Sequence, residues 1–112
     1  MDLSVEIRDG TVVATLPAGV LDTSSVPVLS QKLSPFLEGA QRMVLDLHHL
    51  DFMDSSGLGA LVGYRERLHA AGGHLCLAAV PPRIFKLLKM VKMDQVFGIY
   101  ESVEDAIKAA HK

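Results

Sequence analysis

The chain has 112 residues, of which 49% are hydrophobic and 21% charged, with 11 basic against 13 acidic side chains and a formal net charge of -2. This composition is typical of a globular protein, and the length suits a single domain spanning residues 1–112. The near balance of charge argues against a nucleic-acid partner. A lone cysteine excludes a disulfide framework, and no apolar run approaches the roughly 20 residues that cross a bilayer. We therefore expect a cytoplasmic protein without a membrane partner.

The first half of the chain predicts a hairpin, a helix and a buried strand. Hydrophobic and polar residues alternate from Leu3 to Leu16 around an Asp9-Gly10 turn, which is typical of a β-hairpin. Helical spacing follows over residues 26–37. The apolar run 43–47 is short enough to favour a strand.

Helix-forming and helix-breaking residues set the expected bounds of that first helix. Ser24 or Ser25 can serve as its N-cap, and Pro27 is tolerated in the first turn. Pro35 is expected to end or bend the helix.

The second half of the chain alternates helices with strands. The predicted elements are a helix over residues 55–71 ended by Gly72-Gly73, a strand over 74–80, a helix over 82–91 with one apolar and one basic face, a strand over 96–100, and a final helix capped by Ser102. The order is β-β-α-β-α-β-α-β-α. Right-handed crossovers then predict an α/β fold, with four α-helices and a four- to five-stranded, mostly parallel β-sheet.

One motif, Asp54-Ser55-Ser56-Gly57-Leu58-Gly59, joins the predicted strand region to the second helix. In the simplest interpretation Asp54 or Ser55 is only an N-cap, which contributes about 1 kcal/mol. Capping does not explain Gly57, Gly59 and Gly63, because each glycine inside a helix costs up to about 1 kcal/mol relative to alanine.

The glycines fall into a pattern when residues are placed at 100° steps around this helix. One side carries Leu58, Leu61, Val62 and Leu68, and the opposite side carries Ser56, Gly59, Ala60 and Gly63. The leucine side is expected to face the sheet. Two explanations of the small-residue side stay open: close approach by another macromolecule, or tight packing within the domain.

The motif and its context resemble the STAS domain family, specifically the bacterial anti-sigma factor antagonists. The similarity rests on Asp54-Ser55-Ser56-Gly57-Leu58-Gly59, on the preceding strand at 43–47, and on Gly19-Val20-Leu21-Asp22 upstream. It extends over nearly the whole chain in the order of the elements. The sequence departs from many relatives at Val20, where they carry an acidic or polar residue.

The resemblance implies a partner-switching protein that is not an enzyme and needs no cofactor. Its expected partners are an anti-sigma factor serine kinase of the histidine-kinase-like ATPase fold, which phosphorylates Ser55, and a PPM-type serine phosphatase, which reverses the modification. The expected partner-binding residues are Asp22, Asp54, Ser55, Ser56, Gly57, Gly59 and Gly63. The alternatives are a STAS module that binds a nucleotide, a cytoplasmic subunit of a lipid or anion transporter, and a switch with a non-transcriptional output.

Other chemistry-bearing residues give weaker signals. The motif does not match the G-x-S-x-G pattern of a nucleophile elbow, which argues against a hydrolase. His74 and Cys76 share a face of their strand, but two ligands do not make a metal site, and we predict none. The basic run of Arg83, Lys86, Lys89 and Lys92, with Met90 and Met93, is either a contact patch or ordinary surface and core.

Overall fold

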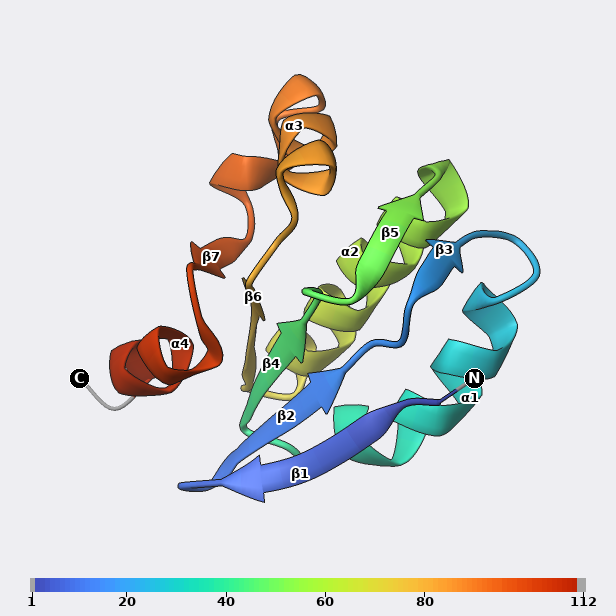
Figure 1. The fold of residues 1–112 in the computed structure, drawn as a ribbon. Coiled ribbons are helices and arrows are strands. Elements are labelled where there is room, and N and C mark those ends of the chain that lie inside the picture. Colours follow the sequence, from blue (N-terminus) through green and yellow to red (C-terminus); the bar gives the residue numbers. More distant parts are fainter. Residues whose placement is uncertain (1, 111–112) are drawn as a thin grey trace.

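The computed structural model describes residues 2–110, apart from the side chain of residue 110, and shows helices packed on both faces of a sheet (Figure 1). The strands are β1 (Ser4–Arg8), β2 (Thr11–Thr15), β3 (Gly19–Leu21), β4 (Arg42–Asp46), β5 (Leu50–Met53), β6 (His74–Ala78) and β7 (Gly98–Tyr100). The helices are α1 (Val26–Leu37), α2 (Ser55–Ala70), α3 (Pro82–Met90) and α4 (Val103–Ala110), with a short 3-10 turn at Met93–Gln95.

The main sheet has five strands in the order β1-β2-β4-β6-β7. β1 pairs antiparallel with β2 through the hairpin, and the remaining neighbours are parallel. Asp9 and Gly10 both have positive φ, as a tight hairpin turn requires. The predicted α/β class, the mostly parallel sheet and the four helices are confirmed.

The predicted element order missed two strands, β3 and β5, which pair parallel with each other in a second small sheet. Figure 1 shows this pair continuing from the ends of β2 and β4. β3 has three residues and β5 has four, with Asp51 exposed in the middle, so neither carries enough alternation to be recognised. The segment between the predicted hairpin and the first predicted helix is therefore partly strand.

The core fills both faces of the main sheet. On one face, α1 contributes Leu29, Leu33 and Leu37, and α2 contributes Leu61 and Leu68, all at most 1% exposed. Burying each such side chain stabilises the fold by roughly 1.5–3 kcal/mol. On the other face, α4 covers a smaller cluster that comprises Val13, Val44, Ala78, Val103, Ala106 and Ile107.

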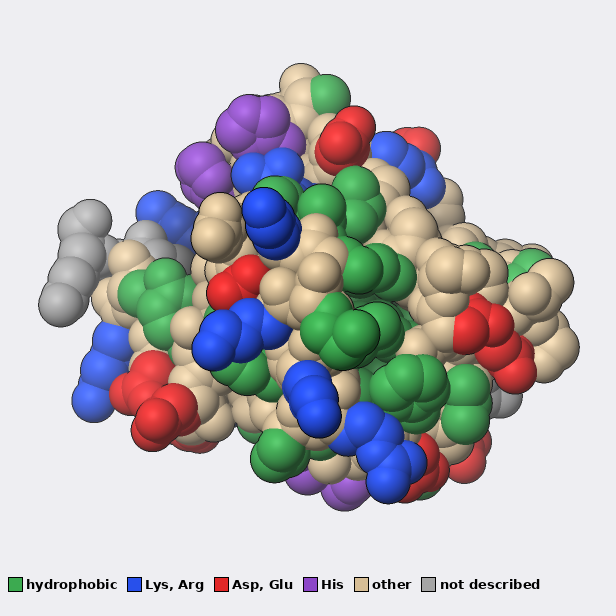
Figure 2. Space-filling model, turned by 90° about the horizontal axis from the view of Figure 1, so that it is seen from above, with side chains coloured by type: hydrophobic (Ala, Val, Ile, Leu, Met, Phe, Trp, Pro, Cys, Tyr) green, Lys and Arg blue, Asp and Glu red, His purple; other side chains and the backbone are tan. Residues whose placement is uncertain are grey.

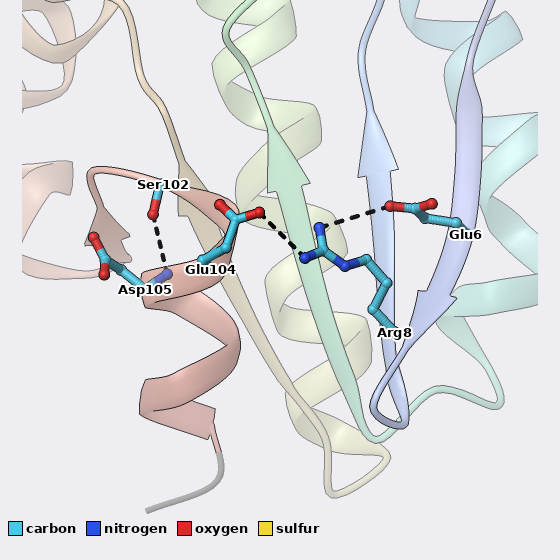
Figure 3. A network of polar contacts seen from close by, with 5 residues as sticks. All are labelled: Glu6, Arg8, Ser102, Glu104 and Asp105. Atoms are coloured by element: carbon cyan, nitrogen blue, oxygen red, sulfur yellow. Dashed lines mark hydrogen bonds and ion pairs between the residues drawn. The ribbon is translucent and has the colours of Figure 1, made fainter.

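Polar contacts fix α4 against the hairpin (Figure 3). Arg8 Nη2 lies 3.2 Å from Glu104 Oε1, and Arg8 Nη1 lies 3.8 Å from Glu6 Oε1. The Asp105 N–H donates to Ser102 Oγ at 3.1 Å, so Ser102 caps the final helix as predicted.

The two ends of α1 differ in detail from what the sequence predicts. The helix does not end at Pro35 but continues to Leu37, because Pro35 is exposed and water can satisfy the Gln31 carbonyl that a proline cannot bond. Ser25 stands at the N-cap position without capping a helical N–H, since its hydroxyl donates to the Val20 carbonyl oxygen at 3.0 Å.

The other predicted helix ends mostly hold. α2 ends before Gly72, whose φ of +86° is the left-handed conformation typical of a C-terminal stop. Ile84 and Leu88 of α3 are buried, but Val91 is 43% exposed, because α3 ends at Met90 and the chain turns away through a left-handed Lys92. Among the residues described, no helix is both long and apolar enough to cross a membrane.

Candidate functional site

Asp54 organises the start of α2. Its Oδ1 accepts hydrogen bonds from the Ser56 N–H at 2.9 Å, the Gly57 N–H at 3.1 Å and the Ser56 hydroxyl at 2.6 Å. These bonds, above all the one from the Ser56 hydroxyl, hold the pKa of the Asp54 carboxyl below its usual value. Asp54 is thus the N-cap, as one of the two predicted alternatives had it, and is ionised at neutral pH.

Asp22 makes the same set of contacts at the end of β3. Its Oδ1 accepts from the Ser24 N–H at 3.0 Å, the Ser24 hydroxyl at 2.8 Å and the Ser25 N–H at 3.1 Å. The Ser24 hydroxyl is again the largest cause of a lowered carboxyl pKa. The runs Leu21-Asp22-Thr23-Ser24 and Met53-Asp54-Ser55-Ser56 therefore form two copies of one turn.

The pairing of β3 with β5 brings the two turns together. Leu21 pairs with Met53, and the Asp54 N–H donates to the Leu21 carbonyl oxygen at 3.1 Å. The hydroxyl oxygens of Thr23 and Ser56 lie 3.4 Å apart. The charge of Asp22 slightly opposes the lowering of the Asp54 pKa, which is a further sign that the carboxylates are neighbours.

Ser55 is the first residue of α2 and is exposed. The hydrogen bonds of the turn engage Ser56 and leave the Ser55 hydroxyl without a partner among residues 2–110. The two serines of the motif therefore differ. Ser56 helps to build the turn, whereas the hydroxyl of Ser55 is exposed to solvent.

The three glycines of α2 have two different explanations. Gly57 is buried, and a Cβ there would lie 2.5 Å from the Leu21 carbonyl oxygen, so packing against β3 requires glycine. Gly59 and Gly63 are exposed, with nothing within 4 Å of a Cβ built on either. Tight packing thus accounts for Gly57, and open surface surrounds the other two.

The leucine side of α2 faces the core as predicted, although unevenly. Leu61 and Leu68 are completely buried, whereas Leu58 and Val62 are only half-buried. Tyr64, which the prediction left out, is also buried, and its hydroxyl lies 2.6 Å from Ser30 Oγ. This contact fixes α2 against α1 and leaves the small-residue side outward.

Thr23 and the surface of α3 were not among the predicted site residues. Thr23 occupies in its turn the place that Ser55 occupies in the other, and the repeated Asp-hydroxyl-Ser pattern was the signal that could have identified it. α3 packs against β5 and exposes Phe85, at 37%, and Met90, at 73%. Met93, by contrast, packs against the core.

The other polar candidates form no catalytic arrangement. His48 Nδ1 lies 2.7 Å from Asp46 Oδ1 at the end of β4. Burial raises the pKa of the Cys76 thiol to about 11, which makes it a poor nucleophile at neutral pH. Residues 2–110 contain no group of three or more His, Cys, Asp or Glu side chains placed to hold a metal ion.

Comparison with known proteins identifies the class to which this fold and site belong. The family model of the STAS domain matches residues 2–106 of the sequence, and the chain belongs to this family. The anti-sigma factor antagonists of this family are regulatory proteins and not enzymes.

Individual relatives narrow the comparison. The anti-sigma F factor antagonist of Paenibacillus polymyxa is 29% identical over 111 residues, which cover 96% of this chain and 94% of the relative. The anti-sigma-B factor antagonist of Bacillus subtilis is 31% identical over 91 residues, with 81% and 84% covered. The structure of the Bacillus cell fate determinant SpoIIAA in its phosphorylated form superposes with a TM-score of 0.73 at 27% identity, covering 97% of this chain and 99% of that one.

Proposed function

We propose that this protein is an anti-sigma factor antagonist controlled by phosphorylation of Ser55. The unphosphorylated form binds an anti-sigma factor that is also a serine kinase of the histidine-kinase-like ATPase fold, and sigma factor is released. Phosphorylation dissociates the complex, and a PPM-type phosphatase restores the binding form. The names of its relatives support the antagonist role, and the phosphorylated form of SpoIIAA supports a covalent switch in this family.

The observation that carries the proposal is the free hydroxyl of Ser55. It lies at an exposed helix N-terminus, where backbone N–H groups and the helix dipole tolerate an added anion. Ser56 is a poorer acceptor, because its hydroxyl donates to Asp54 at 2.6 Å and transfer of a phosphoryl group would break this bond.

Two ionised carboxylates next to Ser55 provide the physical basis of the switch. Phosphorylation adds about -1.5 to -2 charges at neutral pH. Asp54 precedes Ser55, and Asp22 lies in the neighbouring turn, so the negative charges concentrate at one spot. A partner surface that holds ATP phosphates is then repelled.

The surface around Ser55 suits close contact with a protein partner. Gly59 and Gly63 leave α2 bare on its outward side. Figure 2, which views the molecule from above relative to Figure 1, shows hydrophobic side chains gathered on the end that carries α3, with basic side chains among them. Phe85 and Met90 are exposed there, and α3 also exposes Lys86 and Lys89.

The test is phosphorylation by the cognate kinase. The purified protein is incubated with ATP and its cognate kinase, and its intact mass is measured. We expect the gain of one phosphate, no gain in Ser55→Ala, and a retained gain in Ser56→Ala. Modification that persists in Ser55→Ala, or a chain that is never modified, would contradict the proposal.

A further inference from the structure

A cavity of about 460 Å³ lies at the opposite end of the sheet from Ser55. Thr11, Arg42 and His74, which begin β2, β4 and β6, line it together with Gly98 and Tyr100 of β7. Figure 1 shows this region at the foot of the sheet, whereas α2 begins at the far end of β5. The cavity is therefore separate from the proposed phosphorylation site.

Small side chains and a short edge strand create the space. β7 pairs with β6 only from Cys76 to Ala78, so the first part of β6 has no strand beside it on that edge. Gly98 has no side chain, and the described side chains that α4 contributes to the lining are the methyl groups of Ala106 and Ala109. Larger residues at these positions would fill the cavity.

The described lining of the cavity carries basic side chains and no acidic ones. The ionisable lining residues other than Cys76 and Tyr100 are Arg42, Arg65, His69 and His74, and no Asp or Glu belongs to the described lining. The rings of His69 and His74 stand edge to face with centroids 6.3 Å apart. Two guanidinium groups are suited to bidentate bonds with a carboxylate or phosphate, so the lining favours an anion.

Thr11 lies at the wall of the cavity and carries an unpaired hydroxyl. Its side chain is 0% exposed, and its Oγ1 has no hydrogen-bond partner among the described residues. A buried hydroxyl without a partner costs free energy, and most such groups are paired. A molecule in the cavity does not reach this hydroxyl unless the wall shifts around Thr11, because the side chain is closed off from solvent.

We propose that this cavity binds a small organic anion, with a phosphate or carboxylate group held by Arg42 and Arg65 and an apolar body against Tyr100 and Ala109. The volume lies within the range of small-molecule sites. Inorganic phosphate alone would leave much of it empty. The apolar part of the lining thus favours an anion with a compact carbon skeleton.

The test is an NMR titration of the ¹⁵N-labelled chain with phenyl phosphate, benzoate and benzyl alcohol. We expect saturable amide shifts at Thr11, Arg42 and Gly98 with at least one of the two anions, and none with the neutral alcohol. The anion that binds more tightly identifies the preferred head group. The absence of saturable shifts with both anions would overturn the proposal, as would equal binding of the alcohol.

Substitutions distinguish a specific binding site from a general electrostatic attraction of anions to the protein. Arg42→Gln combined with Arg65→Gln should weaken binding about tenfold or more, because charge-assisted hydrogen bonds are lost. Lys86→Gln combined with Lys89→Gln removes the same charge on α3, away from the cavity, and should leave affinity unchanged. Ala109→Leu keeps every charge but fills the cavity and should abolish binding. An equal loss in the lysine variant, or full affinity in Ala109→Leu, would overturn the proposal.

Discussion

At the scale of single residues, the two aspartates of the site act first on the backbone. Asp22 and Asp54 each use one oxygen to satisfy two N–H groups and a hydroxyl of the following residues. Their carboxylates therefore stay ionised and fixed in place without burial. The same side chains that shape the turns also set the negative charge that a phosphate on Ser55 would meet.

Gly57 and Gly59 offer a test of the two roles assigned to glycine in α2. Gly57→Ala should destabilise the fold by about 1–3 kcal/mol, because the new Cβ meets the Leu21 carbonyl oxygen and the chain must shift. Gly59→Ala, two residues on, should stabilise it by up to about 1 kcal/mol. Urea unfolding measures both. Equal effects in the two variants would contradict the distinction.

Because of Cys76, the stability of the fold should depend on pH in the alkaline range. Burial raises the thiol pKa to about 11 from 9.0, so the unfolded chain loses this proton at a lower pH than the folded chain does. The contribution of the protonated thiol is complete below pH 9 and is lost as the pH rises towards 11. Unfolding free energy should therefore fall over this window, and less so in Cys76→Ala. Identical pH profiles of the two proteins would show that the thiol is not shielded from water.

At the scale of elements, hydrophobic period and turn residues predict the longer segments. The hairpin follows from alternation around Asp9-Gly10, and α2 follows from its leucine spacing and Gly72. β3 and β5 were not predicted, because strands of three and four residues are too short to show a hydrophobic alternation. Their pairing, which brings Asp22 to Asp54, is a tertiary event, so only the family resemblance assigned both aspartates to one binding site.

Hydrophobic periodicity predicts on which side of a helix a residue lies, but it does not predict what that side contacts. It placed Gly59 and Gly63 opposite the leucines, but the choice between packing and open surface depends on what lies beside each backbone position. Gly57 lies on the same helix two residues before Gly59 and is closed over by β3. No pattern within α2 alone carries that difference, because the contact comes from a strand 36 residues upstream (57 - 21).

The outward side of α2 supplies the prediction at this scale. Gly63→Leu should weaken binding to the cognate anti-sigma factor while leaving the fold at least as stable, because nothing lies within 4 Å of the new side chain's Cβ and leucine favours a helix. Calorimetric titration measures the affinity, and thermal unfolding measures the stability. Glu66→Leu, an exposed position farther along α2, controls for added hydrophobicity. Unchanged affinity in Gly63→Leu would show that the outward side of α2 does not belong to the interface.

At the scale of the whole molecule, the two aspartate turns and the basic cavity lie at opposite ends of the sheet. The turns that hold Asp22 and Asp54 lie where β3 and β5 end, whereas Arg42 and His74 lie where β4 and β6 begin. The net charge of -2 is the sum of these regions and describes neither. A phosphate on Ser55 would nearly double the net charge of the chain and would add it next to the carboxylates of Asp54 and Asp22.

This arrangement predicts that phosphorylation acts on binding and hardly on folding. Ser55 is exposed and begins a helix whose N-terminus favours an anion by typically 0.3–1 kcal/mol, which offsets repulsion from Asp54 and Asp22. Phosphorylated and unphosphorylated protein should therefore unfold at nearly the same temperature. Their affinities for the cognate anti-sigma factor should differ about 5- to 150-fold, as a coupling of about 1–3 kcal/mol requires.

Ser55→Asp and Ser55→Asn provide a matched pair for this prediction, because they differ in charge but hardly in size. The aspartate variant should bind the anti-sigma factor more weakly than the asparagine variant, and raising the salt concentration should narrow the gap, since exposed charges are screened within about 10 Å at 0.1 M. Equal binding by the two variants would exclude charge repulsion. A large drop in the unfolding temperature of the phosphorylated protein would instead make the switch a change in folding, which the exposed position of Ser55 argues against.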